Sequence, residues 1–456
     1  MKLDAVEIRA LLKLAAPLAL SQLVLIGMGL TDVVVAGRAG TIELAGMTLG
    51  HNVGNIVIFS CFGIGLTAAP LVSRHFGAGR LGDMKNQIQQ VIWACLSIGI
   101  FCFLGMLLAS KLLQQANFDP EIQSIAAKYV GIMSISGFAF CVISGLRSSL
   151  ESVNWTVPVL VINTCAFLIN IPLDIILVNG YFGVPKLGGV GCAIATASIS
   201  TFMVLCFLYL LIRATRKLDV NLLQSFAGPK LAEIKKIFKL GIPICLSLML
   251  ELGFFCGAAI MIVYFGAISA SAHAVAVTLA STTYMIYYGI SQAITIRASR
   301  FLGINDPDGA AHACYTGLKV TFVLSLIFSA MFILGRYQIV ALFSSDPSVI
   351  SMAASLLILS ALFQIADAAQ VSALCGLRAY LDTKSPLVAQ FIAFWLIAFP
   401  FGYLLSRSPD WPQISGAFGY WVAMCIGLSV AAIFLLRKLL VTIKQYTNTA
   451  TASAKI

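Results

Sequence analysis

Long apolar runs separated by short polar segments make up most of this 456-residue chain. Each run approaches or exceeds the 20 or so residues that an α-helix needs to cross the hydrocarbon of a bilayer. Strands of a transmembrane barrel would instead alternate apolar and polar residues over roughly ten positions. The pattern therefore predicts an all-α membrane protein with twelve transmembrane helices, at about residues 14–37, 52–73, 88–110, 128–147, 158–178, 188–212, 239–265, 273–296, 315–335, 350–374, 386–406 and 414–436.

The composition agrees with a chain that lies mostly in lipid. Apolar residues make up 60% of it and charged residues only 10%, against about 25% charged in an average soluble protein. The net charge of +11 comes from basic residues in the short segments between apolar runs, so we expect no nucleic-acid partner. The twelve cysteines lie in or beside apolar runs without Cys-x-x-Cys spacing, which is typical of packing residues and not of zinc or disulfide frameworks.

Basic residues are distributed unevenly between the connections. When alternate connections are assigned to one side together with both termini, that side holds 23 of the 29 Lys and Arg residues. Because cytoplasmic loops carry the excess of Lys and Arg, we expect both termini to be cytoplasmic. The split also favours an even number of helices, since one missed helix would scramble it.

The chain repeats itself. KLAAPLALS at 13–21 matches KLGIPICLS at 239–247, and further matches follow at similar offsets, including Arg74 with Arg300, Asp119-Pro120 with Asp346-Pro347, and Pro172 with Pro400. The repeat predicts two pseudo-symmetric bundles of six helices, an N-lobe at 1–220 and a C-lobe at 221–456. Repeats with an even number of helices are parallel, and two such bundles can rock to expose a central cleft to either side in turn. This architecture favours a transporter.

Four acids lie inside apolar runs, where an ionisable group is expensive and marks a candidate site: Asp32, Asp174, Glu251 and Asp367. Asn170 precedes Asp174 by four residues, so both project from one face of the fifth predicted helix. Pro172 between them removes a backbone hydrogen bond and frees a carbonyl. If Asp32 and Asp174 face one cavity, they do not both ionise readily and titrate as a pair, which suits proton uptake and release. The alternative is that Asp174 reaches water and merely caps a neighbouring helix.

Glu251 and Asp367 are the corresponding acids of the second half. Glu251 is the only Asp, Glu, Lys or Arg between Lys239 and Arg297, and Asp367 lies between Gln364 and Gln370 on the tenth predicted helix. This polar face predicts a cation or substrate site, the alternative being a hydrogen-bonded acid that locks two helices together.

Two other sets of residues are interpreted structurally. Arginines near the cytoplasmic ends of the runs, among them Arg147, Arg297, Arg300 and Arg378, are expected to extend toward the interface. The mildly amphipathic stretch 1–13 is expected to lie at the interface.

Three segments now identify a resemblance. LTDVVVAG around Asp32, NIPLDIILVNGYFGVPKLGGVGCAIAT around Asp174, and FQIADAAQVSALCGLRAY around Asp367 resemble the MATE (multidrug and toxic compound extrusion) transporters, most closely the NorM-like branch. The similarity extends over nearly the whole chain. It implies cation-coupled export of bulky, often cationic amphiphiles from a bacterial cytoplasm across the inner membrane, by two lobes in an outward-open V.

The resemblance also implies roles for single residues. Asp32, Asn170 and Thr196 match the N-lobe cation-coupling site of that family, and Glu251 and Asp367 match the C-lobe acids associated with sodium and substrate. Asp174 departs from the Asn of many NorM-like members and resembles the acid of the DinF-like branch. Phe363 departs from the Tyr that some sodium-coupled members place near the C-lobe cation. The extra acid and the missing hydroxyl favour protons as the coupling ion.

The sequence thus predicts a multidrug efflux antiporter that works by alternating access, acts as a monomer among membrane lipids, and needs no cofactor beyond a coupling proton. Sodium, held at Asp32, Asn170, Glu251 and Asp367, is the alternative ion. A lipid-linked oligosaccharide flippase of the same superfamily is the alternative function, although such proteins line the cleft with basic residues. An integral membrane enzyme is disfavoured, because the sequence offers no clustered nucleophile, base or metal set.

Overall fold

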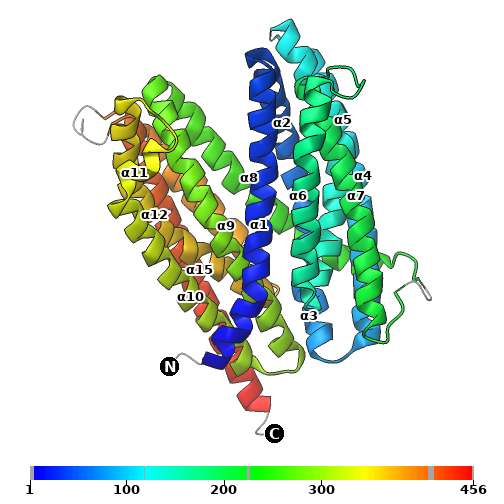
Figure 1. The fold of residues 1–456 in the computed structure, drawn as a ribbon. Coiled ribbons are helices and arrows are strands. Elements are labelled where there is room, and N and C mark those ends of the chain that lie inside the picture. The colour runs from blue at the N-terminus through cyan, green and yellow to red at the C-terminus, as the bar shows by residue number, and fades with distance from the viewer. Residues whose placement is uncertain (1–4, 118, 223–225, 409–414, 454–456) are drawn as a thin grey trace. The chain divides into compact units, whose positions relative to one another are not determined.

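The computed structural model describes residues 5–117, 119–222, 226–408 and 415–453, and this part of the chain contains helices and no strand (Figure 1). The predicted all-α class is therefore confirmed. The first half holds α1 (Ala5–Ala39), α2 (Thr41–Leu66), α3 (Ala68–Gly77), α4 (Leu81–Gln114), α5 (Pro120–Ser152), α6 (Thr156–Asn179) and α7 (Gly189–Arg216). The second half holds α8 (Leu231–Val263), α9 (Ala267–Gly303), α10 (Pro307–Leu334), α11 (Arg336–Ala341), α12 (Pro347–Ala379), α13 (Lys384–Gln390), the π-helix η1 (Phe391–Ala398), α14 (Phe399–Ser406) and α15 (Ala417–Ser453).

Eleven helical segments of the described residues are long and apolar enough to cross a membrane, with α2 and α3 counted as one segment and α13, η1 and α14 as another. Eleven of the twelve predicted runs lie in these segments to within three residues at either end. The remaining run, 273–296, lies in α9, which is 37 residues long but carries Ser, Thr, His, Tyr and Gln among its apolar residues. Lys2, Lys455 and position 414, which entered the predicted topology, lie outside the described residues.

The chain forms two compact units. The N-unit is Leu20–Cys245, and the C-unit combines Met1–Ala19 with Leu246–Ile456. Two helices change unit along their length, α1 after Ala19 and α8 after Cys245. In each case a proline inside the helix, Pro17 or Pro243, lies two residues before the change. The division into lobes at 1–220 and 221–456 follows the sequence repeat and stays a prediction.

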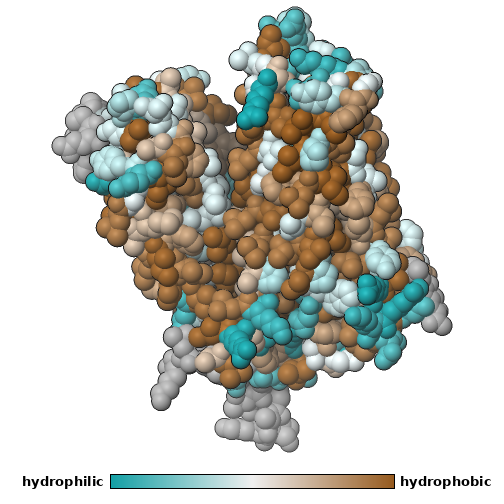
Figure 2. Space-filling view, viewed as in Figure 1, coloured by the Kyte–Doolittle hydropathy of each residue, from teal (hydrophilic) through white to brown (hydrophobic). Residues whose placement is uncertain are grey.

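Each unit has its own apolar core. The N-unit core joins α4, α5 and α7 through fully buried side chains such as Ile88, Leu150 and Phe207. In the C-unit, Phe254 of α8 stacks on Phe394 of η1 with ring centroids 5.0 Å apart. Apolar side chains also cover the outside of the helices, and hydrophilic residues gather toward the helix ends (Figure 2). An apolar exterior of this kind suits lipid and not water as the solvent.

The repeated Asp-Pro dipeptides begin equivalent helices. The Asp119 side chain accepts hydrogen bonds from the backbone N–H groups of Glu121 and Ile122 at the start of α5. Asp346 accepts one from Ser348 at the start of α12. The following proline takes the first helical position, where no backbone donor is needed. The repeated Asp-Pro dipeptide thus marks the start of an equivalent helix in each half.

The first described residues belong to a long helix, and their expected position at the membrane interface stays a prediction. They are the opening turns of α1, and Leu11 is fully buried within the protein. Glu7 is also buried, and its carboxylate accepts two hydrogen bonds from the Arg297 guanidinium of α9, at 2.6 and 2.5 Å. The start of α1 is therefore fastened to the C-unit by an ion pair.

Candidate functional site: two buried acidic clusters

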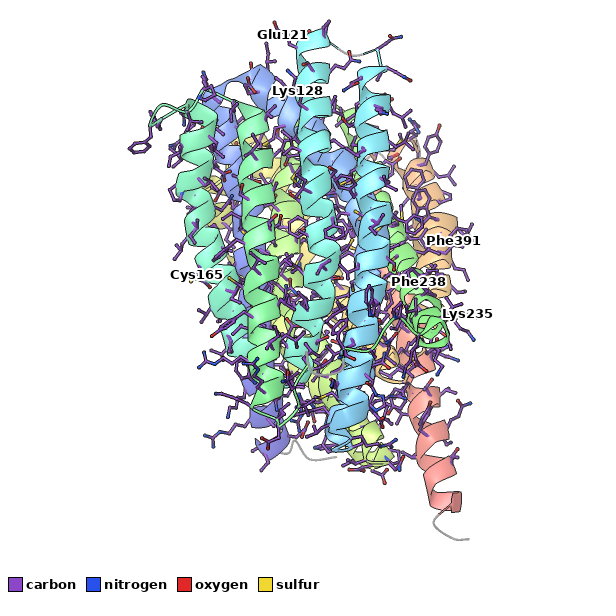
Figure 3. All side chains as sticks on the ribbon, turned by 90° about the vertical axis from the view of Figure 1, so that its right-hand side faces the viewer. Glu121, Lys128, Cys165, Lys235, Phe238 and Phe391 are labelled. Atoms are coloured by element: carbon purple, nitrogen blue, oxygen red, sulfur yellow. The ribbon has the colours of Figure 1, made fainter. Side chains whose placement is uncertain are left out.

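The buried face of α6 is polar, the reverse of a soluble helix. Its buried residues recur every three or four positions and include Asn163, Asn170 and Asp174. Asn170 and Asp174 are both fully buried, with Pro172 inside the helix between them. The opposite side is exposed, as labelled Cys165 illustrates (Figure 3). A helix with this pattern turns its polar stripe inward and its apolar side chains outward.

Asp32 of α1 meets that polar stripe. Its carboxylate accepts a hydrogen bond from the Thr196 hydroxyl of α7 at 3.4 Å, and the Asp174 side chain lies beside it. The Cys192 thiol, one turn before Thr196, donates to the backbone carbonyl of Asp32 at 3.8 Å. The structure thus brings together all four residues predicted for the N-lobe site, from α1, α6 and α7.

Several polar atoms of this N-unit cluster are buried without a hydrogen-bond partner among the described residues. They are one carboxylate oxygen of Asp32, both carboxylate oxygens of Asp174, and both amide atoms of Asn170 and of Asn163. Burying such groups unpaired costs free energy, so each one needs a reason. All of these atoms except the Asp32 oxygen belong to the buried face of α6, which makes this face a candidate site for a proton or a small cation. Asn163 lies two helical turns before Asn170, and this spacing places both on the same face. Asn163 was nevertheless not predicted from the sequence.

Glu43 of α2 fixes the start of α7. Its carboxylate accepts a hydrogen bond from the backbone N–H of Gly189 at 2.6 Å. The preceding Gly188 has a φ of +57°, and a Cβ there would lie 2.2 Å from the Glu43 carboxyl carbon. Only glycine fits this corner. The contact holds the first turn of α7, two turns before Thr196.

The C-unit contains the second cluster. The Gln390 side-chain amide, at the end of α13, donates to the Glu251 carboxylate of α8 at 3.1 Å. Asp367 of α12 is buried near Glu251. Tyr284 and Tyr288 of α9 stack with ring centroids 5.9 Å apart, and Tyr284 lies near both acids. The two acids predicted for the C-lobe are thus neighbours.

Amide side chains surround these acids. Thr283 donates to the Gln364 side-chain carbonyl at 2.8 Å, whereas the Gln364 amide nitrogen and one side-chain oxygen each of Gln370 and Gln390 are buried without a partner among the described residues. Gln390 directly precedes η1, and π-helical segments frequently occur at functional sites. Gln390 was missed from the sequence, although it is the one amide side chain in the run 386–406.

Phe363 and two of the arginines serve packing and internal pairing. Phe363 is buried against the rings of Phe255 and Trp421, at centroid distances of 6.0 and 5.9 Å. Arg147 does not extend to the interface as expected, because its Nε donates to Glu151 at 2.6 Å and both side chains are buried. Arg378 is buried too, near Glu251. The prediction of interfacial arginines is therefore wrong for these two.

No group of three or more His, Cys, Asp and Glu side chains in the described ranges is arranged to hold a metal ion. Both clusters instead combine carboxylates with amides and hydroxyls. Such oxygen groups suit protons or weakly bound hard cations.

The MatE family model matches residues 17–176 and 243–404, one match in each repeat. The chain belongs to the MatE family. It is 33% identical over 440 residues to the multidrug resistance protein MdtK of Yersinia pseudotuberculosis serotype O:1b, with 95% of each chain covered. It is 32% identical over 449 residues to the probable multidrug resistance protein NorM of Idiomarina loihiensis, covering 96% of this chain and 95% of that one.

The fold has a close match among solved structures. The crystal structure of the eukaryotic MATE transporter AtDTX14 superimposes with a TM-score of 0.85 at 20% identity, covering 97% of this chain and 98% of the other. The predicted family and the MATE-like fold are therefore confirmed. As a MatE family member the chain is a transporter and not an enzyme.

Proposed function

We propose that this MatE family member is a multidrug efflux antiporter, which exports amphiphilic, often cationic organic compounds in exchange for protons by alternating access. The observation that carries the proposal is the N-unit cluster, in which Asp32 and Asp174 are buried together. The relatives at 32–33% identity are named as multidrug resistance proteins, which supports drugs as the substrate class.

Two buried carboxylates side by side repel each other and lack the solvation of water, so a proton that neutralises one of them relieves both costs. Uptake of a proton from the outside then favours the inward-opening state, and drug binding with proton release favours return. A ligand shifts such an equilibrium only by its different affinity for the two states. Asp32 and Asp174 must therefore change partners or hydration between the states.

The C-unit cluster is suited to an organic cation or a second coupling ion. Glu251 and Asp367 supply negative charge, and the stacked rings of Tyr284 and Tyr288 offer faces that attract cations. We assign substrate or cation binding to this cluster and proton coupling to Asp32, Asn170, Asp174 and Thr196.

Sodium is the alternative coupling ion, with Asp32 and Asn170 as its ligands in one unit and Glu251 and Asp367 in the other. The second acid at Asp174 favours a proton, since a bound proton neutralises a carboxylate pair directly. A flippase for lipid-linked oligosaccharides is disfavoured by the acids of both clusters, which would repel a pyrophosphate.

We further propose that the protein lies in a bacterial inner membrane as a monomer, with both termini cytoplasmic. The positive-inside distribution supports this orientation. In the C-unit, α1 begins and α15 ends toward the same edge (Figure 1), as an even number of spans requires.

Drug uptake into everted vesicles, driven separately by a pH gradient and by a sodium gradient, tests the proposal. The pH gradient is expected to drive uptake by the unaltered protein, and Asp32→Asn is expected to abolish it. Asp83→Asn is the matched control, because Asp83 is an exposed acid on α4. Uptake driven by sodium alone, or undiminished proton-driven uptake by Asp32→Asn, would contradict it.

A further inference from the structure

A groove runs along one face of α15, outside both acidic clusters. It has a volume of about 530 Å³ and is lined by Val430, Ile433, Phe434, Arg437, Lys438 and Val441. These residues recur at helical spacing, so they form a single stripe on the surface of the C-unit. Ile433, Phe434 and Val441 are 53%, 44% and 52% exposed.

The stripe changes character along its length. Its first part, at 430–434, is apolar and lies in the predicted span 414–436. Arg437 and Lys438 follow directly, and Lys444 lies two turns beyond Arg437 on the same face. Arg437 lies 20 residues after Ala417, where α15 begins, or about 30 Å along the helix at 1.5 Å per residue. That length is close to the thickness of the hydrocarbon, so Arg437 reaches the interface.

The charge at this end of the groove is largely uncompensated. The helix α15 contains no Asp or Glu along its whole length. Asp382 approaches Lys438 at 3.8 Å, but its carboxylate also accepts hydrogen bonds from the backbone N–H and the hydroxyl of Ser385. Arg437 is exposed and has no ion pair within the described ranges.

The equivalent helix of the other repeat does not reproduce this arrangement. At the offset of 228 that aligns Gly191 with Gly419, Arg437 and Lys438 correspond to Tyr209 and Leu210 of α7. The first basic residue of α7 is Arg213, which corresponds to Val441. In the register of the repeat, the cations of α15 therefore begin one helical turn earlier along the helix than those of α7.

We propose that this groove binds one anionic phospholipid, with an acyl chain along Val430, Ile433 and Phe434 and the headgroup phosphate at Arg437 and Lys438. An apolar surface stripe that ends in two cations at the interface matches the length and charge of such a lipid. Basic sites on the cytoplasmic side of helix bundles bind anionic headgroups in this way. The guanidinium of Arg437 suits a phosphate because it can donate two parallel hydrogen bonds.

Native mass spectrometry of the purified full-length chain, with phosphatidylglycerol or phosphatidylethanolamine added to the micelles, tests the proposal. The unaltered protein is expected to retain phosphatidylglycerol in preference to phosphatidylethanolamine. Arg437→Gln is expected to weaken phosphatidylglycerol retention about fivefold, since one basic residue contributes about that factor at an anionic surface. Arg437→Lys keeps the positive charge and is expected to retain most of the phosphatidylglycerol that Arg437→Gln loses.

Two further variants separate the groove from surface charge in general. Arg213→Gln removes an exposed charge from the end of α7 and is expected to leave retention unchanged. Ile433→Trp fills the apolar part without altering charge and is expected to lower retention. Equal losses for Arg437→Gln and Arg213→Gln, full retention by Ile433→Trp, or equal retention of the two lipids by the unaltered protein would each overturn the proposal. The readout is binding, so it is independent of transport.

Discussion

At the scale of single residues, Asp174 is the most informative position, because both of its carboxylate oxygens are buried without a hydrogen-bond partner among the described residues. Asp174→Asn removes the ionisable group while keeping the size of the side chain. We expect this variant to lose proton-driven drug uptake and to be at least as thermostable as the unaltered protein, since no formed hydrogen bond is lost and a buried acid is removed.

Thr196→Val is the matched comparison, because it removes the hydroxyl that donates to Asp32. We expect it to lower the melting temperature in detergent, by a change in unfolding free energy on the order of 1 kcal/mol. If Asp174→Asn were the less stable of the two, Asp174 would be a structural residue and its role in coupling would be wrong.

The ion pair between Glu7 and Arg297 is a residue-scale feature with a structural consequence. Glu7→Gln leaves the largely buried Arg297 guanidinium without its carboxylate. Removing one partner of a buried pair destabilises strongly, and we expect about 3 kcal/mol, measured as a lower melting temperature in detergent.

The control for that variant is Glu233→Gln, which breaks a solvent-exposed pair with Lys236. Its expected cost is below about 0.5 kcal/mol, because exposed pairs are solvated and screened. Equal effects of the two variants would show that Glu7 does not fasten α1 as the geometry indicates.

At the scale of elements, the segment between the two repeats is bonded to α4. Gln89 donates to the carbonyl of Leu222 and accepts from the N–H of Ala227, at 2.8 and 3.2 Å. Gln90 donates to Gly228 and accepts from Lys230, at 3.1 and 2.7 Å. Each amide thus satisfies two backbone groups of the connection, which sequence composition alone would describe as a polar loop.

We expect the double variant Gln89→Ala and Gln90→Ala to be cleaved by trypsin after Lys230 on the order of tenfold faster, because local opening exposes the segment to protease. Asn86→Ala, an exposed amide on the same helix, is expected to behave as the unaltered protein. Unchanged cleavage of the double variant would mean that other contacts hold the segment.

An element could be predicted from the sequence when a local pattern of residues indicates it. Runs of apolar residues report membrane helices directly, and repeated dipeptides such as Asp119-Pro120 report their starts. The π-helix η1 and the first turns of α1 at residues 5–13 carry no such local signal. From the sequence alone Glu7 would be interpreted as a charge at the interface, because its partner Arg297 lies 290 residues away along the chain.

The residues of the two acidic clusters could likewise be predicted only in part. Asp32, Asp174, Glu251 and Asp367 were evident because a charge in an apolar run is conspicuous. Asn163 and Gln390 were missed, since an amide in an apolar run costs less than a charge and attracts less notice. Arg147 was misassigned because its position near a helix end does not reveal that Glu151, one turn on, neutralises it inside the protein.

At the scale of the whole molecule, the even number of predicted spans and the basic connections predict that both termini lie on the cytoplasmic side. A green fluorescent protein fused after Lys444 is expected to fluoresce. Alkaline phosphatase inserted between residues 181 and 187 is expected to be active, because that connection is predicted to face outward. The reciprocal fusions are the controls, and an active phosphatase after Lys444 would contradict the topology.

The exchange of helix segments between the two units, after Ala19 in α1 and after Cys245 in α8, bears on protein engineering and on how the two gene halves evolved. In a chimera of two relatives joined in the segment between the repeats, each unit would contain one helix segment from the other parent. The C-unit would receive residues 1–19 from it, and the N-unit would receive the part of α8 up to Cys245. Recombination between relatives should therefore be tolerated better when residues 1–19 travel with the second half of the gene. Because each unit contains a segment encoded by the other half of the gene, the two halves would have diverged together and not as independent modules.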